Sequence, residues 1–404
     1  MSKLEELIQQ YCPDGVEYVK LGDVCKLARG TRVVKKDLST SGTYPVYQNS
    51  LKPLGYYDQF NRAEETTFII CAGAAGDIGY SKVKFWSADD CFSIICPETI
   101  SNRYIFYCLS SQQKRIYSQV RKASIPRLSH GAVAALHIPV PPLPVQQEIV
   151  RILDNLAELQ AELQAELQAE LQKRIQQYNY YRDKLLSFNE LSDGGGQSVS
   201  VEWKKLGEIG VFYGGLSGKT KEDFKDGNAK FISYKNVFYN LSLNIDTDER
   251  VKIGEGEKQN TIQYGDILFT GSSETPDECG MSSVLTQKTD EKLYLNSFCF
   301  GYRLHNPSLF CLDFLKHLFR SNELRKQIGK TASGTTRFNV SKKRFAEVSI
   351  PVPPLSVQKQ IADTLDKFYT LTADLTTGLP AEIEARRKQY EYYRDQLLTF
   401  KQKA

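Results

Sequence analysis

The sequence is poor in the residues that build metal sites and has no long apolar run. Its 404 residues include only four histidines and nine cysteines, and no two cysteines form a CxxC pair. The spacing of ligands found in zinc proteins is therefore absent. No apolar stretch reaches the roughly 18 residues that a membrane span needs, and the charged start MSKLEELIQQ is unlike a secretory signal. We expect reduced cysteines, no metal, no membrane partner and a cytoplasmic location.

Signatures of catalysis are also missing. The segment GGLSGKT, residues 214–220, is one residue short of a phosphate-binding loop, because GxxxxGKT needs a glycine where Tyr213 stands. No Asp or Asn precedes a Pro-Pro-aromatic triplet, which is the arrangement expected in an adenine methyltransferase pocket. The formal net charge of +4, from 52 basic and 48 acidic side chains, neither proves nor excludes a nucleic-acid partner. We predict no catalytic residue in this chain, so any chemistry must come from a partner.

What the sequence does contain is an internal repeat. Residues 138–188, from IPVPPLPVQQEI to YNYYRDKLLSF, align without a gap with residues 350–400, from IPVPPLSVQKQI to YEYYRDQLLTF. The offset is 350 minus 138, or 212, and about half of the aligned positions are identical. The two halves also open alike, with VEYVKLGDV at 16–24 and VEWKKLGEI at 201–209. The chain is therefore a tandem duplication.

Between these matching ends the two halves differ in sequence and in length. Both middles combine apolar, β-branched segments between glycine turns with one segment of helical pattern, which predicts a mixed α/β module in each half. Strands are predicted within 68–86, 92–97, 266–273 and 298–304, and helices over 103–120 and 314–328. The predicted domains are a first module at 1–143, a helix at 144–190, a linker at 191–200, a second module at 201–354 and a helix at 355–404.

The helix after each proline-rich segment is unusually long. Glycine and proline are absent from 145–188, a run of about 44 residues or roughly 66 Å of helix. Within it, AELQ occurs four times in succession at 157–172 and places leucines four residues apart on one stripe. Gly378 and Pro380 predict a kink or break in the second helix. We expect the two helices to pair through Leu159, Leu163, Leu167, Leu171, Leu371, Leu375, Leu379 and Ile383.

The duplicated IPVPPL, the long helix after each copy, the tetrapeptide repeats and the YxYYRDxLL ends together resemble the specificity subunit of type I restriction-modification enzymes. The resemblance covers nearly the whole chain. It implies two target-recognition domains, at 16 to about 137 and 201 to about 349, that read the two halves of a split, asymmetric double-stranded DNA sequence. It also implies that the two long helices pack antiparallel as a coiled-coil spacer and dock two methylation subunits, to which restriction-motor subunits add. S-adenosylmethionine, ATP and Mg would then be bound by those partners, with no cofactor in this chain.

Basic residues gather near the end of each middle, where a charge run is either a solvated face or a phosphate-binding surface. Arginine also reads guanine in the major groove, which favours the arginines of the short loops SIPRLS and TTRFNVS. The predicted DNA contacts are Arg115, Lys122, Arg127, Lys330, Arg337 and Lys342, with Arg32 and Lys219 as weaker candidates.

The repeated tyrosines allow two interpretations. Tyr178 and Tyr181, like Tyr390 and Tyr393, share a helix face and either pack against a module or form a docking surface for the methylation subunit. Two rival functions also stay open. A structural coiled-coil adaptor would show no salt-dependent DNA binding, whereas a phosphate-loop nucleotidase would bind ATP. If the AELQ run is a ruler, one unit adds about 6 Å, or one to two base pairs at about 3.4 Å each.

Overall fold

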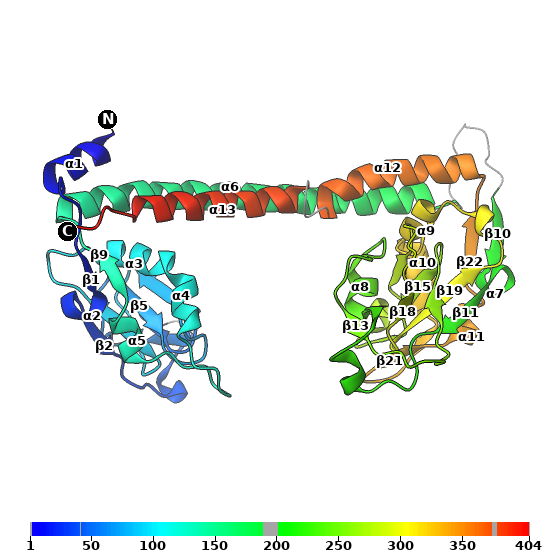
Figure 1. The fold of residues 1–404 in the computed structure, drawn as a ribbon, viewed down its shortest axis with the longest axis horizontal. Helices are drawn as coiled ribbons and strands as arrows, with labels where there is room; N and C mark the ends of the chain where they lie inside the picture. Colours follow the sequence, from blue (N-terminus) through cyan, green and yellow to red (C-terminus); the bar gives the residue numbers. More distant parts are fainter. Residues whose placement is uncertain (1, 41, 189–200, 374–377, 404) are drawn as a thin grey trace. The chain divides into compact units, whose positions relative to one another are not determined.

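The computed structural model describes residues 2–40, 42–188, 201–373 and 378–403 (Figure 1). The chain divides into two compact units. The first unit holds Met1–Leu167 and Glu382–Ala404, and the second holds Gln168–Ala381. Each unit therefore contains one module together with parts of the long helices. The predicted linker at 191–200 lies outside the described residues.

The first module is built on an antiparallel sheet whose strands pair in the order β2 (Lys26–Arg29), β8 (Cys91–Ile95), β5 (Thr66–Ile70) and β6 (Ile78–Ser81). A smaller sheet has the order β4 (Gly55–Tyr57), β3 (Tyr44–Tyr47) and β7 (Trp86–Ser87), with β3 and β7 parallel. β5 is buried along its whole length, since α3 packs over it. The helices are α1 (Lys3–Tyr11), α2 (Leu21–Val24), α3 (Asn102–Ser111), α4 (Gln113–Ser118) and α5 (His130–Ala134), with the short 3-10 turn η1 (Lys35–Asp37).

The second module repeats this plan with added strands. Its main sheet has the order β11 (Gly210–Gly214), β19 (Cys299–Leu304), β15 (Ile267–Thr270) and β17 (Ser282–Val284). The other sheet has the order β13 (Arg250–Val251), β12 (Ala229–Ile232), β18 (Leu293–Leu295) and β14 (Thr261–Ile262), and β12 and β18 are again parallel. A third sheet joins β16 (Ser272–Ser273), β21 (Phe338–Val340) and β20 (Ala332–Ser333).

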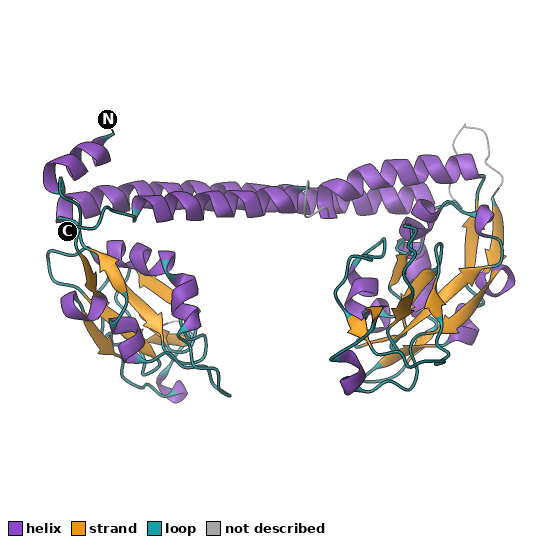
Figure 2. Cartoon of the chain, in the orientation of Figure 1, coloured by secondary structure: helices purple, strands orange, loops and turns teal. Residues whose placement is uncertain are grey.

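Short helices border the sheets of the second module, as Figure 2 shows. They are α7 (Leu206–Ile209), α8 (Tyr234–Tyr239), α9 (Leu312–Leu318), α10 (Asn322–Gly329) and α11 (Lys342–Phe345), with 3-10 turns η2 (Lys221–Phe224), η3 (Pro276–Glu278) and η4 (Pro307–Leu309). The matching order of the main sheets confirms that two modules of dissimilar sequence share one fold. The predicted strands of both middles are present with boundaries shifted by a few residues, whereas each predicted helix is divided into two, α3 and α4 in the first module and α9 and α10 in the second.

The repeated ends of each half meet in a two-stranded sheet. In the first half β1 (Tyr18–Lys20) pairs with β9 (His137–Pro139), and in the second β10 (Glu202–Lys205) pairs with β22 (Ser349–Val352). Each pair is antiparallel and joins the matched opening to the strand of the IPV segment. The repeated sequence is thus the frame that closes each module, which explains why these segments match while the middles differ.

The long helices are α6 (Leu143–Leu186) and α12 (Leu355–Ala373), which follow the two proline-rich segments, and α13 (Leu379–Leu397), which comes after α12 in the chain. In the first unit α13 runs antiparallel beside α6, and Leu397 and Leu398 join the core formed by Val145 and Ile149. In the second unit α12 packs on α6, where the rings of Tyr181 and Phe368 stack with centroids 5.1 Å apart. Pro380 is the second residue of α13, a position where its missing N–H leaves no helix bond unmade.

The leucine stripe is less buried than the sequence suggested. Leu159 is 61% exposed and Leu371 is 47% exposed. The remaining described members of the stripe are half-buried, namely Leu163, Leu167, Leu171, Leu379 and Ile383, and Leu375 lies outside the described residues. Burial is instead complete near the ends of α6, at Val145, Ile149, Leu153 and Leu186, because there the module packs against the helices as a further layer. Within the described part of the chain, no helix is long and apolar enough to cross a membrane.

Candidate nucleic-acid interface

A short hairpin carries the basic residues predicted near the end of the first module. Arg121 and Arg127 pair across it, with the Arg121 N–H donating to the Arg127 carbonyl at 2.8 Å. Arg127 also pairs with Ala72, beyond the end of β5, so the hairpin is anchored on the main sheet. The side chains of Lys122 and Arg127 are exposed. This hairpin therefore holds two predicted contacts at defined positions on a rigid support.

Beside the hairpin lies a cavity of about 660 Å³ whose lining includes Arg29, Arg121, Arg127 and Asp90. The Cys71 thiol sits among these charges. Burial, with a smaller contribution from the Asp90 carboxylate, raises the pKa of Cys71 to about 11, although Arg29 and Arg127 oppose the shift. The lining includes three arginines and one carboxylate, so the cavity has a surplus of positive charge, which suits a phosphate or the acceptor edge of a base.

The other two predicted residues of the first module lie outside this hairpin. Arg32 is exposed in the loop that follows β2. Arg115 is exposed on α4, where its guanidinium reaches the side-chain oxygen of Gln112 at 3.4 Å.

The second module has a corresponding hairpin formed by β20 and β21, at the end of the module remote from α12 (Figure 1). Asn339 pairs with Ser272 and so occupies the place that Arg127 has in the first module, while Arg337 lies two residues earlier. The Arg337 guanidinium donates to the Ser272 hydroxyl at 3.2 Å and lies 5.2 Å from the centroid of the Phe298 ring. Lys330 and Lys342 flank the hairpin and are exposed, and the Lys342 ammonium lies 5.5 Å from the Phe300 ring centroid.

Lys219 has an internal partner. Its ammonium group lies 2.6 Å from the Glu257 carboxylate, and only 9% of its side chain is exposed. The hydrogen bond from Lys219 lowers the pKa of Glu257 to about 2. The residues after Lys219 form the four-residue η2 and not the long helix that follows a phosphate-binding loop. Lys219 is thus paired within its own module, and its place among the weaker DNA contacts stays a prediction.

Arg325, which belongs to the same basic run as Lys330, also points inward. Its guanidinium donates to the carbonyls of Gly280, Asp277 and Cys279 at 2.5–2.7 Å. Burial lowers its pKa to about 10. Arg325 thus fastens the turn around η3, and its charge is not presented to solvent.

The repeated tyrosines divide between interior and surface. Tyr178 is 7% exposed, and its hydroxyl lies 2.9 Å from Nδ1 of His317 on α9. Tyr390 is half-buried in the first unit, where burial raises its pKa and Arg103 and Asp154 are nearby charges. Tyr181 is half-buried against Phe368, whereas Tyr393 is 48% exposed. Tyr178 therefore packs against a module, which is one of the two interpretations of its pattern, and Tyr393 keeps an open face.

Sequence reasoning missed an equivalent pair of carboxylates that clamp each module to its helix. Asp154 on α6 accepts hydrogen bonds from Arg103 at 2.8 Å and Tyr107 at 2.6 Å. Asp366 on α12, 212 residues later, accepts bonds from Lys316 and from Nε2 of His317 at 2.8 Å. Burial opposes ionisation of Asp366, but the bonds from His317 and Lys316 hold its pKa below the usual value. The sequence did offer one signal for this pair, because both positions are aspartate and lie one repeat offset of 212 residues apart.

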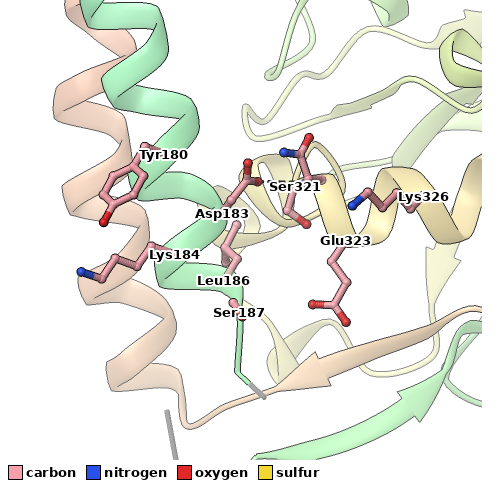
Figure 3. Close-up of a pocket in the computed structure, with 9 residues that line it drawn as sticks. Tyr180, Asp183, Lys184, Leu186, Ser187, Ser321, Glu323 and Lys326 are labelled. Atoms are coloured by element: carbon pink, nitrogen blue, oxygen red, sulfur yellow. Dashed lines mark hydrogen bonds between the residues drawn. The ribbon is translucent and has the colours of Figure 1, made fainter. Parts of the chain in front are cut away.

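The described surface also has a cavity of about 530 Å³ between α6 and α10 (Figure 3). Tyr180 and Lys184 of α6 line one side, and Ser321, Glu323 and Lys326 line the other. Tyr180 is 60% exposed, and Tyr392, its counterpart at the offset of 212, is 61% exposed. The two halves thus present the same aromatic residue to solvent to the same extent, and the tyrosines chosen from the sequence are their neighbours.

The family model described as the type I restriction modification DNA specificity domain matches residues 13–173 and again residues 199–385. The chain belongs to the type I specificity family. The type I restriction enzyme EcoR124I/EcoR124II specificity subunit of Escherichia coli is 32% identical over 435 residues, covering 99% of this chain and 97% of that protein. The family inferred from the repeated motifs is therefore confirmed, and the chain is a DNA-recognition component of the type I restriction-modification kind.

A solved structure supports the fold of this type I specificity chain. A chain from work on complex assembly and conformational transition of the type I R-M system superposes with a TM-score of 0.63 at 18% identity, covering 96% of this chain and 98% of that chain. At this identity the likeness speaks for the fold alone. It agrees with the expected architecture of two α/β modules, each followed by a long helix.

Proposed function

We propose that the two modules read the two halves of an asymmetric double-stranded DNA sequence and direct adenine methylation by two partner methylation subunits. The observation that carries this proposal is that the two modules share one sheet topology but expose different side chains. The hairpins at Arg121–Arg127 and at β20–β21 occupy equivalent places yet present different side chains. Two readers of one design with different reading surfaces favour a split target with unlike halves.

The chain itself is proposed to be noncatalytic. Support comes from the internal ion pair of Lys219, which removes the one candidate for a nucleotide-binding lysine from solvent. S-adenosylmethionine, ATP and Mg belong in this proposal to the partner subunits, where methyl transfer and DNA translocation take place. A restriction-motor subunit would join the same assembly and act on DNA that lacks the methyl mark.

The docking faces for the methylation subunits are proposed to lie around Tyr180 and Tyr392. Each tyrosine is more than half exposed and occupies the same position of the repeat. Two equivalent faces suit two copies of one partner. The exposed ring, the neighbouring Lys184 and the cavity beside α10 supply the mixture of aromatic and polar groups that is common at interfaces.

The spacing between the two half-sequences is proposed to depend on α6. The AELQ units are continuous helix throughout 157–172, and none of their leucines belongs to a module core, so the length of the run can change without disturbing either core. The gap then follows the helix length at about 1.5 Å per residue.

The test is to assemble the chain with its methylation subunit and S-adenosylmethionine and to map every methylated adenine in a genome or random library. A split site with two unlike halves and a fixed gap is the expected result. Methylation without a defined sequence would refute the proposal. A chain that binds neither DNA nor a methylation subunit would point instead to a structural adaptor.

A further inference from the structure

One turn has the same backbone position in both modules. In the first module it spans residues 88–91 and in the second 296–299. Five backbone hydrogen bonds match between the modules. In the first module the N–H to carbonyl pairs are Gly30 to Cys91, Thr31 to Ser87, Ala88 to Tyr47, Cys91 to Ala88 and Cys71 to Asp90. In the second module the equivalent pairs, in the same order, are Gly215 to Cys299, Leu216 to Leu295, Asn296 to Ile232, Cys299 to Asn296 and Gly271 to Phe298. The turn is therefore a fixed part of the shared fold.

Within this turn Asp90 and Phe298 are counterparts. The Asp90 carbonyl accepts the Cys71 N–H at 2.7 Å, and the Phe298 carbonyl accepts the Gly271 N–H at 2.7 Å. A Cβ at Gly271 would lie only 2.8 Å from the Phe298 carbonyl oxygen, so a side chain there would force this turn to shift, whereas the first module has Cys71 at the equivalent place. An acidic side chain in the first module and an aromatic one in the second thus occupy the same backbone position, each next to the equivalent hairpin.

In the first module this position is polar. Asp90 is half-buried and lines the cavity that also contains Arg29, Arg121 and Arg127. Among the described residues, the Asp90 carboxylate has no hydrogen bond or ion pair of its own. A carboxylate that has no direct partner and lines a cavity open to solvent can accept a hydrogen bond from outside the chain.

In the second module the position is aromatic and exposed. Phe298 is 54% exposed, and its N–H donates to the side chain of Asn296 at 2.9 Å, which fixes the turn. Arg337 lies over the ring at 5.2 Å from its centroid and is oriented by the Ser272 hydroxyl. An exposed Phe on a fixed turn gains no stability from burial of its ring. The adjacent Arg337 is of the residue type that reads bases.

We propose that this turn is the position that sets which base each module reads. In the second module the Phe298 ring packs against the 5-methyl group of a thymine, while Arg337 bonds the O6 and N7 atoms of an adjacent guanine in the major groove. In the first module Asp90 accepts a hydrogen bond from the N4 amino group of a cytosine. This inference rests on the proposed function, in which each module reads one half of the DNA site.

The first experiment compares methylated-site maps of the assembled complex for Phe298→Ala, Asp90→Ala and the wild-type chain. Phe298→Ala is expected to weaken the preference for one thymine of the second half-sequence by on the order of tenfold, with the first half-sequence and the gap unchanged. Asp90→Ala is expected to relax one position of the first half alone. Tyr239→Ala is the matched control, because Tyr239 is 71% exposed in the same module and lies outside the turn.

The second experiment isolates the methyl group. Binding of the complex to the mapped duplex is measured with thymine or uracil at the position that Phe298→Ala relaxes. The wild-type chain should lose on the order of tenfold in affinity with uracil, and Phe298→Ala should bind both duplexes equally.

The outcomes separate this inference from the function beneath it. A wild-type map with a defined split site, together with unchanged half-sequences in both turn variants, would overturn the assignment of the turn and leave the reader function standing. Equal loss of both half-sequences in either variant would also overturn it, since that result reports general weakening. A wild-type map with no defined site would remove the proposed function, and this inference with it.

Discussion

Gln146 and Gln358 make the same three hydrogen bonds in the two halves of the chain. Each side-chain oxygen accepts a backbone N–H that lies just before a module helix, from Ser101 at 2.9 Å and from Cys311 at 2.8 Å. Each amide nitrogen donates to two carbonyls, those of Pro141 and Thr99 in the first half and of Pro353 and Leu309 in the second. Both side chains are fully buried. One residue per half therefore ties the proline-rich segment, the module and the long helix together.

Replacing Gln146 by leucine should destabilise the first unit by on the order of 3 kcal/mol, because two carbonyls and one N–H lose their partner in the interior. The chain has two tryptophans, Trp86 in the first module and Trp203 in the second. In a Trp203→Phe background, urea unfolding followed by Trp86 fluorescence reports the first unit. Gln147→Leu is the matched control, because Gln147 is the exposed neighbour. If Gln146→Leu and Gln147→Leu lower the urea midpoint of unfolding by similar amounts, the buried amide of Gln146 has no special role.

The sequence predicted the frame of the molecule better than its contacts. The repeat, the missing glycine and proline in 145–188 and the alternation of apolar segments are local signals, and they located both modules and the long helices. Strand order depends on pairing between distant segments, such as β1 with β9, and no local pattern encodes it. For the same reason the sequence did not reveal the partners of Lys219 and Tyr178. Lys219 bonds to Glu257, which is 38 residues away, and Tyr178 bonds to His317, which is 139 residues away.

His317 is predicted to make the second unit sensitive to mild acid. Burial lowers its pKa below 6.5, although Asp366 opposes the shift. With a neutral ring, Nε2–H donates to Asp366 and Nδ1 accepts from Tyr178, which satisfies both nitrogens. The unfolded chain takes up a proton near pH 6.5, whereas the folded chain resists it, so this contribution to stability is present above that pH and is lost as the pH falls below it.

Hydrogen exchange of α9 amides between pH 7.5 and 5, corrected for the intrinsic pH dependence, measures this effect. Protection should fall with pH in the wild-type chain and fall less in His317→Gln, since glutamine makes similar hydrogen bonds without titrating. His305→Gln changes an exposed histidine of the same module and should behave like the wild type. The same loss of protection in all three chains would exclude His317 as the origin.

Lys122 and Lys219 should differ in their effect on the salt dependence of DNA binding. Lys122 is exposed on its hairpin, whereas the ammonium of Lys219 is bonded to Glu257. Loss of one phosphate contact lowers the slope of log affinity against log salt concentration by about 0.9. Lys122→Ala in the assembled complex should show this decrease, and Lys219→Ala should keep the wild-type slope while lowering the stability of the second module. A reduced slope for Lys219→Ala would mean that its ion pair opens on DNA.

Tyr180 and Tyr392 should each control the binding of one methylation subunit. A glutamate in place of either exposed ring puts a charge into a desolvated contact, which commonly costs several kcal/mol at an interface. Native mass spectrometry should find one methylation subunit bound to Tyr180→Glu, one bound to Tyr392→Glu and none bound to the double variant. Tyr239→Glu, at an exposed tyrosine at the end of α8 and outside α6 and α13, should bind two. Two bound subunits in the double variant would place the docking faces elsewhere.

Removing one AELQ unit from 157–172 should shorten the gap of the recognised site without changing either half-sequence. Four residues fewer shorten α6 by about 6 Å, equivalent to one to two base pairs at about 3.4 Å each, and turn the following segment by about 40°. The small turn matters, because each module must still meet its groove. Replacing the same unit by four alanines keeps the length and strong helix propensity, so its gap should equal that of the wild type. If both variants keep the original gap, the AELQ run acts only as a brace and other contacts set the spacing. If the alanine variant alone changes the gap, side-chain pairing along the helices sets the gap and the length of α6 does not.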